Sequence, residues 1–226
     1  MPGATRVTAA PLRRYPSAMN RTIDAKRALK HLSNDPVMAG VIEGVGEFRG
    51  WPPSADPFRA LSRSIIFQQL SGKAAQTIFN RFIGIWGLEG EAFPQPGQML
   101  ASIDDELRAV GLSRQKAASV RSLAEHFASG ELSLHNFEAW DDEEIIAYLT
   151  RVRGVGRWTA EMFLMFHLGR PDVLPVNDVG INRAMMKQYG LPALPKPPEV
   201  LSIGEAWRPW ATVACWYLWR SEDVQT

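Results

Sequence analysis

The residues with the clearest chemical potential lie near the boundary between an expected loop and an expected helix. Asp178 stands in the stretch Leu174-Pro175-Val176-Asn177-Asp178-Val179-Gly180-Ile181, where a proline-containing loop gives way to a helical pattern. The positive end of a helix dipole favours an ionised carboxylate at this position. Such a carboxylate stabilises a developing positive charge during a reaction, serves as the helix N-cap, or does both.

A second candidate lies upstream, where Gly154-Val155-Gly156 separates the end of one expected helix from the start of the next. Glycines permit positive φ angles and close approach of the backbone to a ligand. The amides of a helix N-terminus suit a phosphate, so Gly154, Gly156, Arg157 and Thr159 are candidate contacts to a DNA backbone. A lone Gly-x-Gly is also compatible with an ordinary corner between two helices.

The elements that position these residues are expected to be helices. Apolar residues recur at helical spacing, as in Phe58, Leu61 and Ile65, and no stretch shows convincing alternation of apolar and polar residues. Asp141 and Glu144 have the spacing of an acidic capping box, although four consecutive acidic residues could instead bind a cation. The sequence therefore predicts an all-α fold.

Composition limits the class of protein. The 226 residues are 46% hydrophobic, which is enough for a sizeable core without disulfide bonds. The net charge is only +1, so any basic surface must be local, and the strongest basic bias lies in residues 1–30. We expect residues 1–20 to be a disordered basic segment, with a phosphate-contacting arm as the alternative.

The single cysteine, Cys215, lies in an apolar stretch and cannot form an internal disulfide. The apolar runs are shorter than a membrane span, and the N-terminus lacks a signal-peptide core. We therefore expect no membrane association and a cytoplasmic location, close to the nucleoid if the source is bacterial.

The glycine hairpin and the downstream Asp178 together resemble the helix-hairpin-helix superfamily of base-excision glycosylases, and within it the 3-methyladenine DNA glycosylase II branch for alkylated purines. The resemblance spans roughly residues 28–220, and further stretches support it: His31–Pro36, Ile65–Ala74 and Gly111–Ala117. It implies two helical lobes with a cleft between them and the hairpin at its mouth. One lobe would comprise residues 55–170, and the flanking lobe residues 21–54 and 171–226.

The resemblance implies that the enzyme flips a damaged base out of double-stranded DNA and hydrolyses its N-glycosidic bond. Asp178 would stabilise the oxocarbenium-like transition state. Trp158 occupies the position at which related lyases carry a lysine, so the resemblance implies a monofunctional enzyme. Alkylated purines such as 3-methyladenine and 7-methylguanine carry positive charge, which aromatic rings attract.

The resemblance also implies roles for individual residues. Trp158, Trp219, Gln68 and Met162 would contact the substrate. Met162 replaces a second aromatic residue, which leaves the preference among 3-methyladenine, 7-methylguanine, 1-methyladenine and hypoxanthine open. Besides the hairpin, the implied DNA contacts are the wedge residue Gln69 and the phosphate-binding residues Ser71, Gly72 and Lys73.

No cofactor is expected to be required. The resemblance implies a monovalent cation, Na⁺ or K⁺, bound by the backbone carbonyls of Thr150, Val152 and Val155. A single cysteine argues against an iron-sulfur cluster, and we expect a monomer. Two alternatives stay open: a non-catalytic helix-hairpin-helix module that only binds DNA, and a glycosylase for oxidised or deaminated bases.

Overall fold

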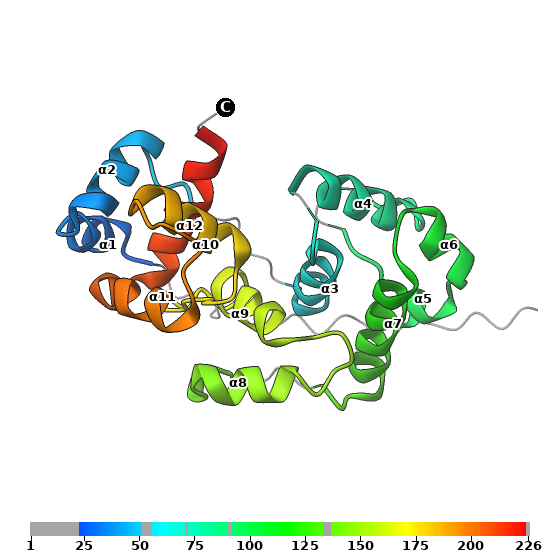
Figure 1. Cartoon of the computed structure of the whole chain (residues 1–226). Helices are drawn as coiled ribbons and strands as arrows, with labels where there is room; N and C mark the ends of the chain where they lie inside the picture. Colours follow the sequence, from blue (N-terminus) through cyan, green and yellow to red (C-terminus); the bar gives the residue numbers. More distant parts are fainter. Residues whose placement is uncertain (1–22, 51–55, 71, 90–91, 133–136, 225–226) are drawn as a thin grey trace, which may run out of the picture.

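The computed structural model describes residues 23–50, 56–70, 72–89, 92–132 and 137–224, so the basic segment 1–20 lies outside it. Within these residues the chain forms helices and no strand, which confirms the all-α prediction (Figure 1). The α-helices are α1 (Ala25–Leu32), α2 (Pro36–Val45), α3 (Pro57–Phe67), α4 (Gly72–Gly84), α5 (Pro96–Ala101), α6 (Asp104–Ala109), α7 (Arg114–Ser129), α8 (Asp142–Leu149), α9 (Arg157–Phe166), α10 (Val179–Gln188), α11 (Pro197–Gly204) and α12 (Ala211–Val224). Two short 3₁₀ helices are η2 (Phe137–Ala139) and η3 (Glu205–Trp207).

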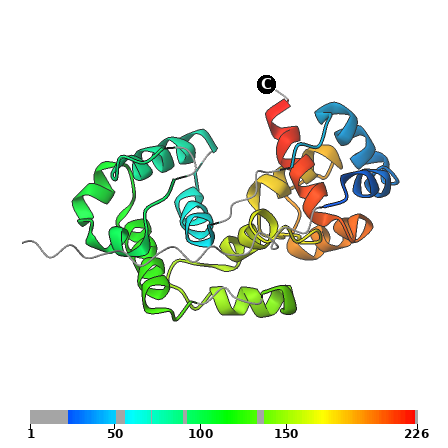
Figure 2. The same cartoon turned by 180° about the vertical axis from the view of Figure 1, so that it is seen from behind.

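The helices pack in two groups. In the first, the terminal lobe, α12 packs against α1, α2 and α10, while α11 packs against η3. In the second, the central lobe, α3 contacts α4, α7 and α9; α5 and α6 pack on α7, and α8 packs on α9. Two opposite views show the terminal lobe at one end of the molecule and α4 to α7 of the central lobe at the other, with α9 between them and α8 below it (Figures 1 and 2). The chain therefore runs from the terminal lobe through the central lobe and back.

Local signals explain where several helices begin. Asp35 and Asp56 accept hydrogen bonds from the first amides of α2 and α3, and each is followed by a proline at the first helical position. Asp141 and Glu144 form a reciprocal capping box at the start of α8, so the capping interpretation of this acidic run is correct.

The core of the terminal lobe is built around α12. Residues 211–218 of this helix are each at most 6% exposed, which explains their apolar composition. Cys215 lies within this run, and burial raises the pKa of its thiol well above the usual range. Across the described parts of the chain, no helix combines the length and apolarity that crossing a bilayer requires.

Candidate active site

Asp178 is the N-cap of α10 and a buried carboxylate at the same time. Its side chain is largely enclosed, with the residue only 8% exposed, and Oδ1 accepts a hydrogen bond of 2.8 Å from the amide of Ile181. Asn182 Nδ2 donates to the carbonyl of Val176 at 3.1 Å, which secures the loop before α10. The cap fixes the direction in which the carboxylate points, and it leaves Oδ2 free of the backbone of α10, so capping does not exclude a second role for Asp178.

Two indole groups converge on this carboxylate. Trp158 Nε1, on α9, donates to Asp178 Oδ2 at 2.7 Å, and Trp219 Nε1, on α12, donates to Asp178 Oδ1 at 3.0 Å. Together with the Ile181 amide, they give the carboxylate three N–H donors, which stabilise its negative charge without neutralising it. Both indole rings are partly exposed. The ring centroid of Trp219 lies 5.8 Å from that of Phe166.

Gly180 leaves the space that this arrangement needs. A Cβ atom at Gly180 would lie 3.1 Å from Asp178 Oδ1, 3.1 Å from Trp219 Cδ1 and 3.2 Å from Trp219 Nε1. These separations are tighter than ordinary van der Waals contacts. A side chain at position 180 would therefore displace Asp178 or Trp219 by a few tenths of an ångström, whereas the helical backbone at this position does not itself need glycine.

We expect Gly180→Ala to lower the rate of base release about 3- to 10-fold, because a shift of a few tenths of an ångström in Asp178 and Trp219 disturbs their geometry. The free energy of unfolding should change little, because the higher helix propensity of alanine, about 1 kcal/mol, offsets the cost of the close contacts made by its Cβ. Single-turnover base release and thermal unfolding measure the two effects. Gly44→Ala in α2, where a Cβ meets nothing within 4 Å, is the matched control and should leave the rate unchanged. A Gly180→Ala rate equal to wild type would show that the contacts relax without cost.

The glycine hairpin joins α8 to α9. Gly154 has a φ of +82°, and a Cβ there would lie 2.0 Å from Ser119 Oγ and 2.3 Å from Ser119 Cβ. Gly156 is the exposed N-cap of α9 and has no side chain to bond the first amides of that helix. Amides at such a helix start are open to a phosphate oxygen.

Arg157 and Thr159 follow the hairpin, but their side chains are engaged within the protein. Arg157 forms a two-pronged ion pair with Glu143, and its Nε donates to Glu161 Oε1 at 3.0 Å. Thr159 is only 1% exposed, and its hydroxyl accepts a hydrogen bond from Gln68. In this conformation both side chains are bound to other residues of the protein.

The turn between α3 and α4 carries the other expected DNA contacts. Gln68 Nε2 donates to the carbonyl of Gly154 at 2.9 Å and to Thr159 Oγ1 at 2.8 Å, so its amide joins this turn to the hairpin. Gln69 is exposed and has a φ of +56°, the one positive φ outside glycine in the described residues. Gly72 and Lys73 are exposed at the start of α4, and Ser71 lies outside the described residues.

Of the remaining predicted site residues, Met162, Val152 and Val155 are buried, whereas Thr150 is exposed. Met162, one turn after Trp158, is only 4% exposed and belongs to the core along α9. Of the three carbonyls assigned to a cation, that of Val152 already accepts the amide of Val155 at 3.0 Å, and Thr150 is the C-cap of α8. A carbonyl oxygen has two lone pairs, so the hydrogen bond to Val152 does not exclude a cation there. The cation site stays a prediction.

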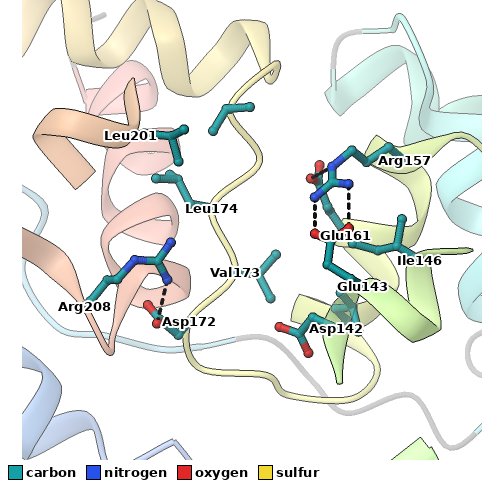
Figure 3. A pocket seen from close by; sticks show the side chains of 12 residues that line it. Asp142, Glu143, Ile146, Arg157, Glu161, Asp172, Val173, Leu174, Leu201 and Arg208 are labelled. Carbon is teal, nitrogen blue, oxygen red and sulfur yellow. Dashed lines mark hydrogen bonds and ion pairs between the residues drawn. The ribbon is translucent and has the colours of Figure 1, made fainter. Parts of the chain in front are cut away.

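A pocket of about 410 Å³ is lined by residues of α8, α9 and the loop before α10, with Arg208 and Leu201 at its edge (Figure 3). Its lining does not include Asp178, Trp158 or Trp219, so it is distinct from the site built around the carboxylate. Glu161 projects toward it beside Arg157 and is 5% exposed. Burial raises the pKa of Glu161 from its ordinary 4.5 to about 7, against the opposing charge of Arg157.

This raised pKa predicts a pH dependence of stability. The folded protein holds a proton on Glu161 that the unfolded chain releases above pH 4.5, so the free energy of unfolding should fall as the pH rises to about 7. Glu161→Gln should remove this loss, so that the variant gains up to about 3 kcal/mol over wild type between pH 5 and pH 8.

Denaturant unfolding at several pH values measures this difference. Glu143→Gln is the control, because Arg157 lowers the pKa of Glu143 and its titration lies below the tested range. A wild-type curve parallel to that of Glu161→Gln would show that Glu161 is ionised throughout.

The sequence did not indicate three structurally important residues: Gly180, Ser119 and Lys116. Ser119 packs directly against Gly154, and Lys116 Nζ bonds the carbonyls of Ile66 and Gln68. Lys116 does lie within Gly111–Ala117, one of the stretches that carried the resemblance, but spacing alone gives no partner for it.

Comparisons with known proteins agree with this geometry. A family model described as "HhH-GPD superfamily base excision DNA repair protein" matches residues 62–209. The chain is 38% identical over 170 residues to DNA-3-methyladenine glycosylase 1 of Schizosaccharomyces pombe, covering 75% of this chain and 74% of that protein. It is 32% identical over 205 residues to the alkylbase DNA glycosidase-like protein mag2 of the same organism, covering 89% and 96%. A solved structure of an S. pombe 3-methyladenine DNA glycosylase in complex with abasic DNA superposes with a TM-score of 0.80 at 36% identity, over 87% of this chain and 97% of that one.

Proposed function

Because this chain belongs to the HhH-GPD superfamily of base excision DNA repair proteins, we propose that it excises alkylated purines from double-stranded DNA by hydrolysing their N-glycosidic bond. The observation that carries the proposal is Asp178, a buried carboxylate whose two oxygens are fixed by Trp158 and Trp219. The similarity to named DNA-3-methyladenine glycosylases supports the substrate class.

Asp178 would act on the sugar of the flipped nucleotide. As the bond from C1′ to the base nitrogen breaks, its electron pair leaves with the base, and positive charge develops on the sugar. The Asp178 carboxylate stabilises that charge and orients a water molecule, which adds to C1′ and loses a proton to the carboxylate and then to solvent. The products are a free base and an abasic site.

A cationic leaving group explains why one carboxylate is sufficient. An N-alkylated purine leaves as a neutral base, so it does not need a general acid to protonate it. Position 158 holds a tryptophan that donates to Asp178, and no lysine among the described residues donates to this carboxylate. Water is therefore the proposed nucleophile, and the enzyme is proposed to be monofunctional.

The hairpin and the α3–α4 turn are both proposed to contact the DNA backbone. The tip of the α3–α4 turn is also proposed to fill the gap left by the flipped base. The amides after Gly156 would bind one phosphate, Gly72 and Lys73 would contact another, and Gln69 would enter the duplex. We further propose that the protein acts as a monomer and, if bacterial, in the cytoplasm near the nucleoid.

Release of free bases from methylated duplex DNA tests the proposal. The purified protein is expected to release 3-methyladenine or 7-methylguanine, identified by chromatography, and to leave an 8-oxoguanine duplex intact. Release from the 8-oxoguanine duplex alone would favour a glycosylase for oxidised bases. Binding without any release would leave a helix-hairpin-helix module that only binds DNA.

A further inference from the structure

Lys116, on α7, makes two short bonds to the end of α3. Its Nζ donates to the carbonyl of Ile66 and to the carbonyl of Gln68, both at 2.7 Å. Carbonyls in the last turn of a helix have no partner within the helix, and a cation there satisfies them and complements the helix dipole. The half-buried ammonium is thus directed at the point where α3 turns toward α4.

The bond to Gln68 also constrains the next residue. The carbonyl of Gln68 belongs to the peptide plane that joins Gln68 to Gln69, and Gln69 has the unfavourable φ of +56°. A non-glycine residue adopts this left-handed conformation only where its surroundings fix it. Lys116 fixes one side of the torsion, and Gln69 is exposed at the tip of the turn.

The same helix face also supports the hairpin. Ser119, one turn after Lys116 on α7, packs against Gly154 so closely that no Cβ fits there. Gln68 then connects the two parts, since its side chain donates to the carbonyl of Gly154 while its own carbonyl accepts from Lys116. The turn, the hairpin and α7 therefore form one connected unit.

We propose that Lys116 is a positioning residue for base extrusion, which holds Gln69 in its left-handed conformation at a fixed place relative to the DNA-binding hairpin. This inference rests on the proposed function, because it assigns Gln69 to the gap left by a flipped base. The unit keeps the wedge and the backbone contacts in register on the duplex. Lys116 takes no part in bond cleavage.

The test compares 7-methylguanine opposite cytosine with 7-methylguanine opposite an abasic analogue, where no pairing has to be broken. Lys116→Met removes the donors while keeping a long side chain, and Lys116→Arg keeps donors at the same position. Single-turnover release is measured with the full chain, and 2-aminopurine placed beside the lesion reports unstacking by fluorescence.

We expect Lys116→Met to slow release from the paired lesion about tenfold and to reduce the fluorescence change. The reason is that a displaced Gln69 would stabilise the unpaired, extruded state of the base less well. Release from the unpaired lesion should fall less than about twofold, and Lys116→Arg should recover most of the paired rate. Should Lys116→Met not fold, Lys116→Leu, which also removes the donors, carries the same comparison.

Equal losses on both substrates would overturn the proposal, because they would place Lys116 in the catalytic geometry or the general fold. The slope of log affinity for DNA against log salt concentration gives a second outcome that would overturn it. If Lys116→Met reduced this slope by the equivalent of about one phosphate, Lys116 would itself contact the DNA backbone. Failure of the proposed function itself would look different, since wild type would release no base from either duplex.

Discussion

Asp178→Asn is expected to reduce base release from methylated DNA by about 100- to 1000-fold, because a preorganised charge would be missing where positive charge develops. The variant keeps the size of the side chain, and its oxygen can still cap α10. With that oxygen in the place of Oδ1, which accepts from Ile181 and Trp219, the amide nitrogen takes the place of Oδ2 and faces the Trp158 indole N–H, which lies 2.7 Å from Oδ2 in the wild type, so that two donors oppose each other. Single-turnover release resolved by chromatography measures the effect.

Two measurements separate chemistry from folding and binding. Affinity for abasic-site DNA should stay within a few-fold of wild type, because the hairpin is unchanged. Asp172→Asn is the matched control, since Asp172 pairs with Arg208 and makes no bond to the tryptophans. Wild-type release by Asp178→Asn would contradict the mechanism even if the protein bound damaged DNA.

Gly154→Ala is expected to lower the free energy of unfolding by about 2–4 kcal/mol and to abolish detectable DNA binding. Two causes act together: a φ of +82° that alanine rarely adopts, and a Cβ that would lie 2.0 Å from Ser119 Oγ. The hairpin must move away from α7, and that movement carries the amides at the start of α9 with it. Thermal unfolding and a gel-shift titration on abasic-site DNA measure the two losses.

The neighbouring glycine gives the control. Gly156 has a φ of −88°, and a Cβ there meets nothing within 4 Å, so Gly156→Ala should leave stability within about 0.5 kcal/mol of wild type. Its only expected effect is weaker DNA binding, since it is exposed at the N-terminus of α9. Adding Ser119→Gly to Gly154→Ala should recover part of the lost stability, because it removes the clash but not the strained φ. If Gly154→Ala and Gly156→Ala were equally stable, the close contact with α7 would not constrain the hairpin.

What the sequence could predict was local. The acidic helix starts, the glycine turn and the position of Asp178 at a helix N-terminus depend on neighbours within a few residues, and the structure has all three. The indole bonds to Asp178 depend on α9, α10 and α12 meeting, so the sequence could identify the two rings but not the direction of their N–H groups. Arg157 shows the converse. Its place after the hairpin indicated a phosphate contact, yet Glu143, on the preceding helix α8, binds its guanidinium.

The indole N–H groups bear on how a base can be recognised. Tryptophan has one hydrogen-bond donor and no acceptor, and in both Trp158 and Trp219 that donor is directed at Asp178. Neither ring can therefore read the Watson–Crick or Hoogsteen edge of a nucleobase. What they can offer is a π face, which discriminates by charge and polarisability rather than by the pattern of donors and acceptors. If these two rings recognise the base, as we propose, they should accept adenine and guanine adducts alike, provided that alkylation has made them cationic.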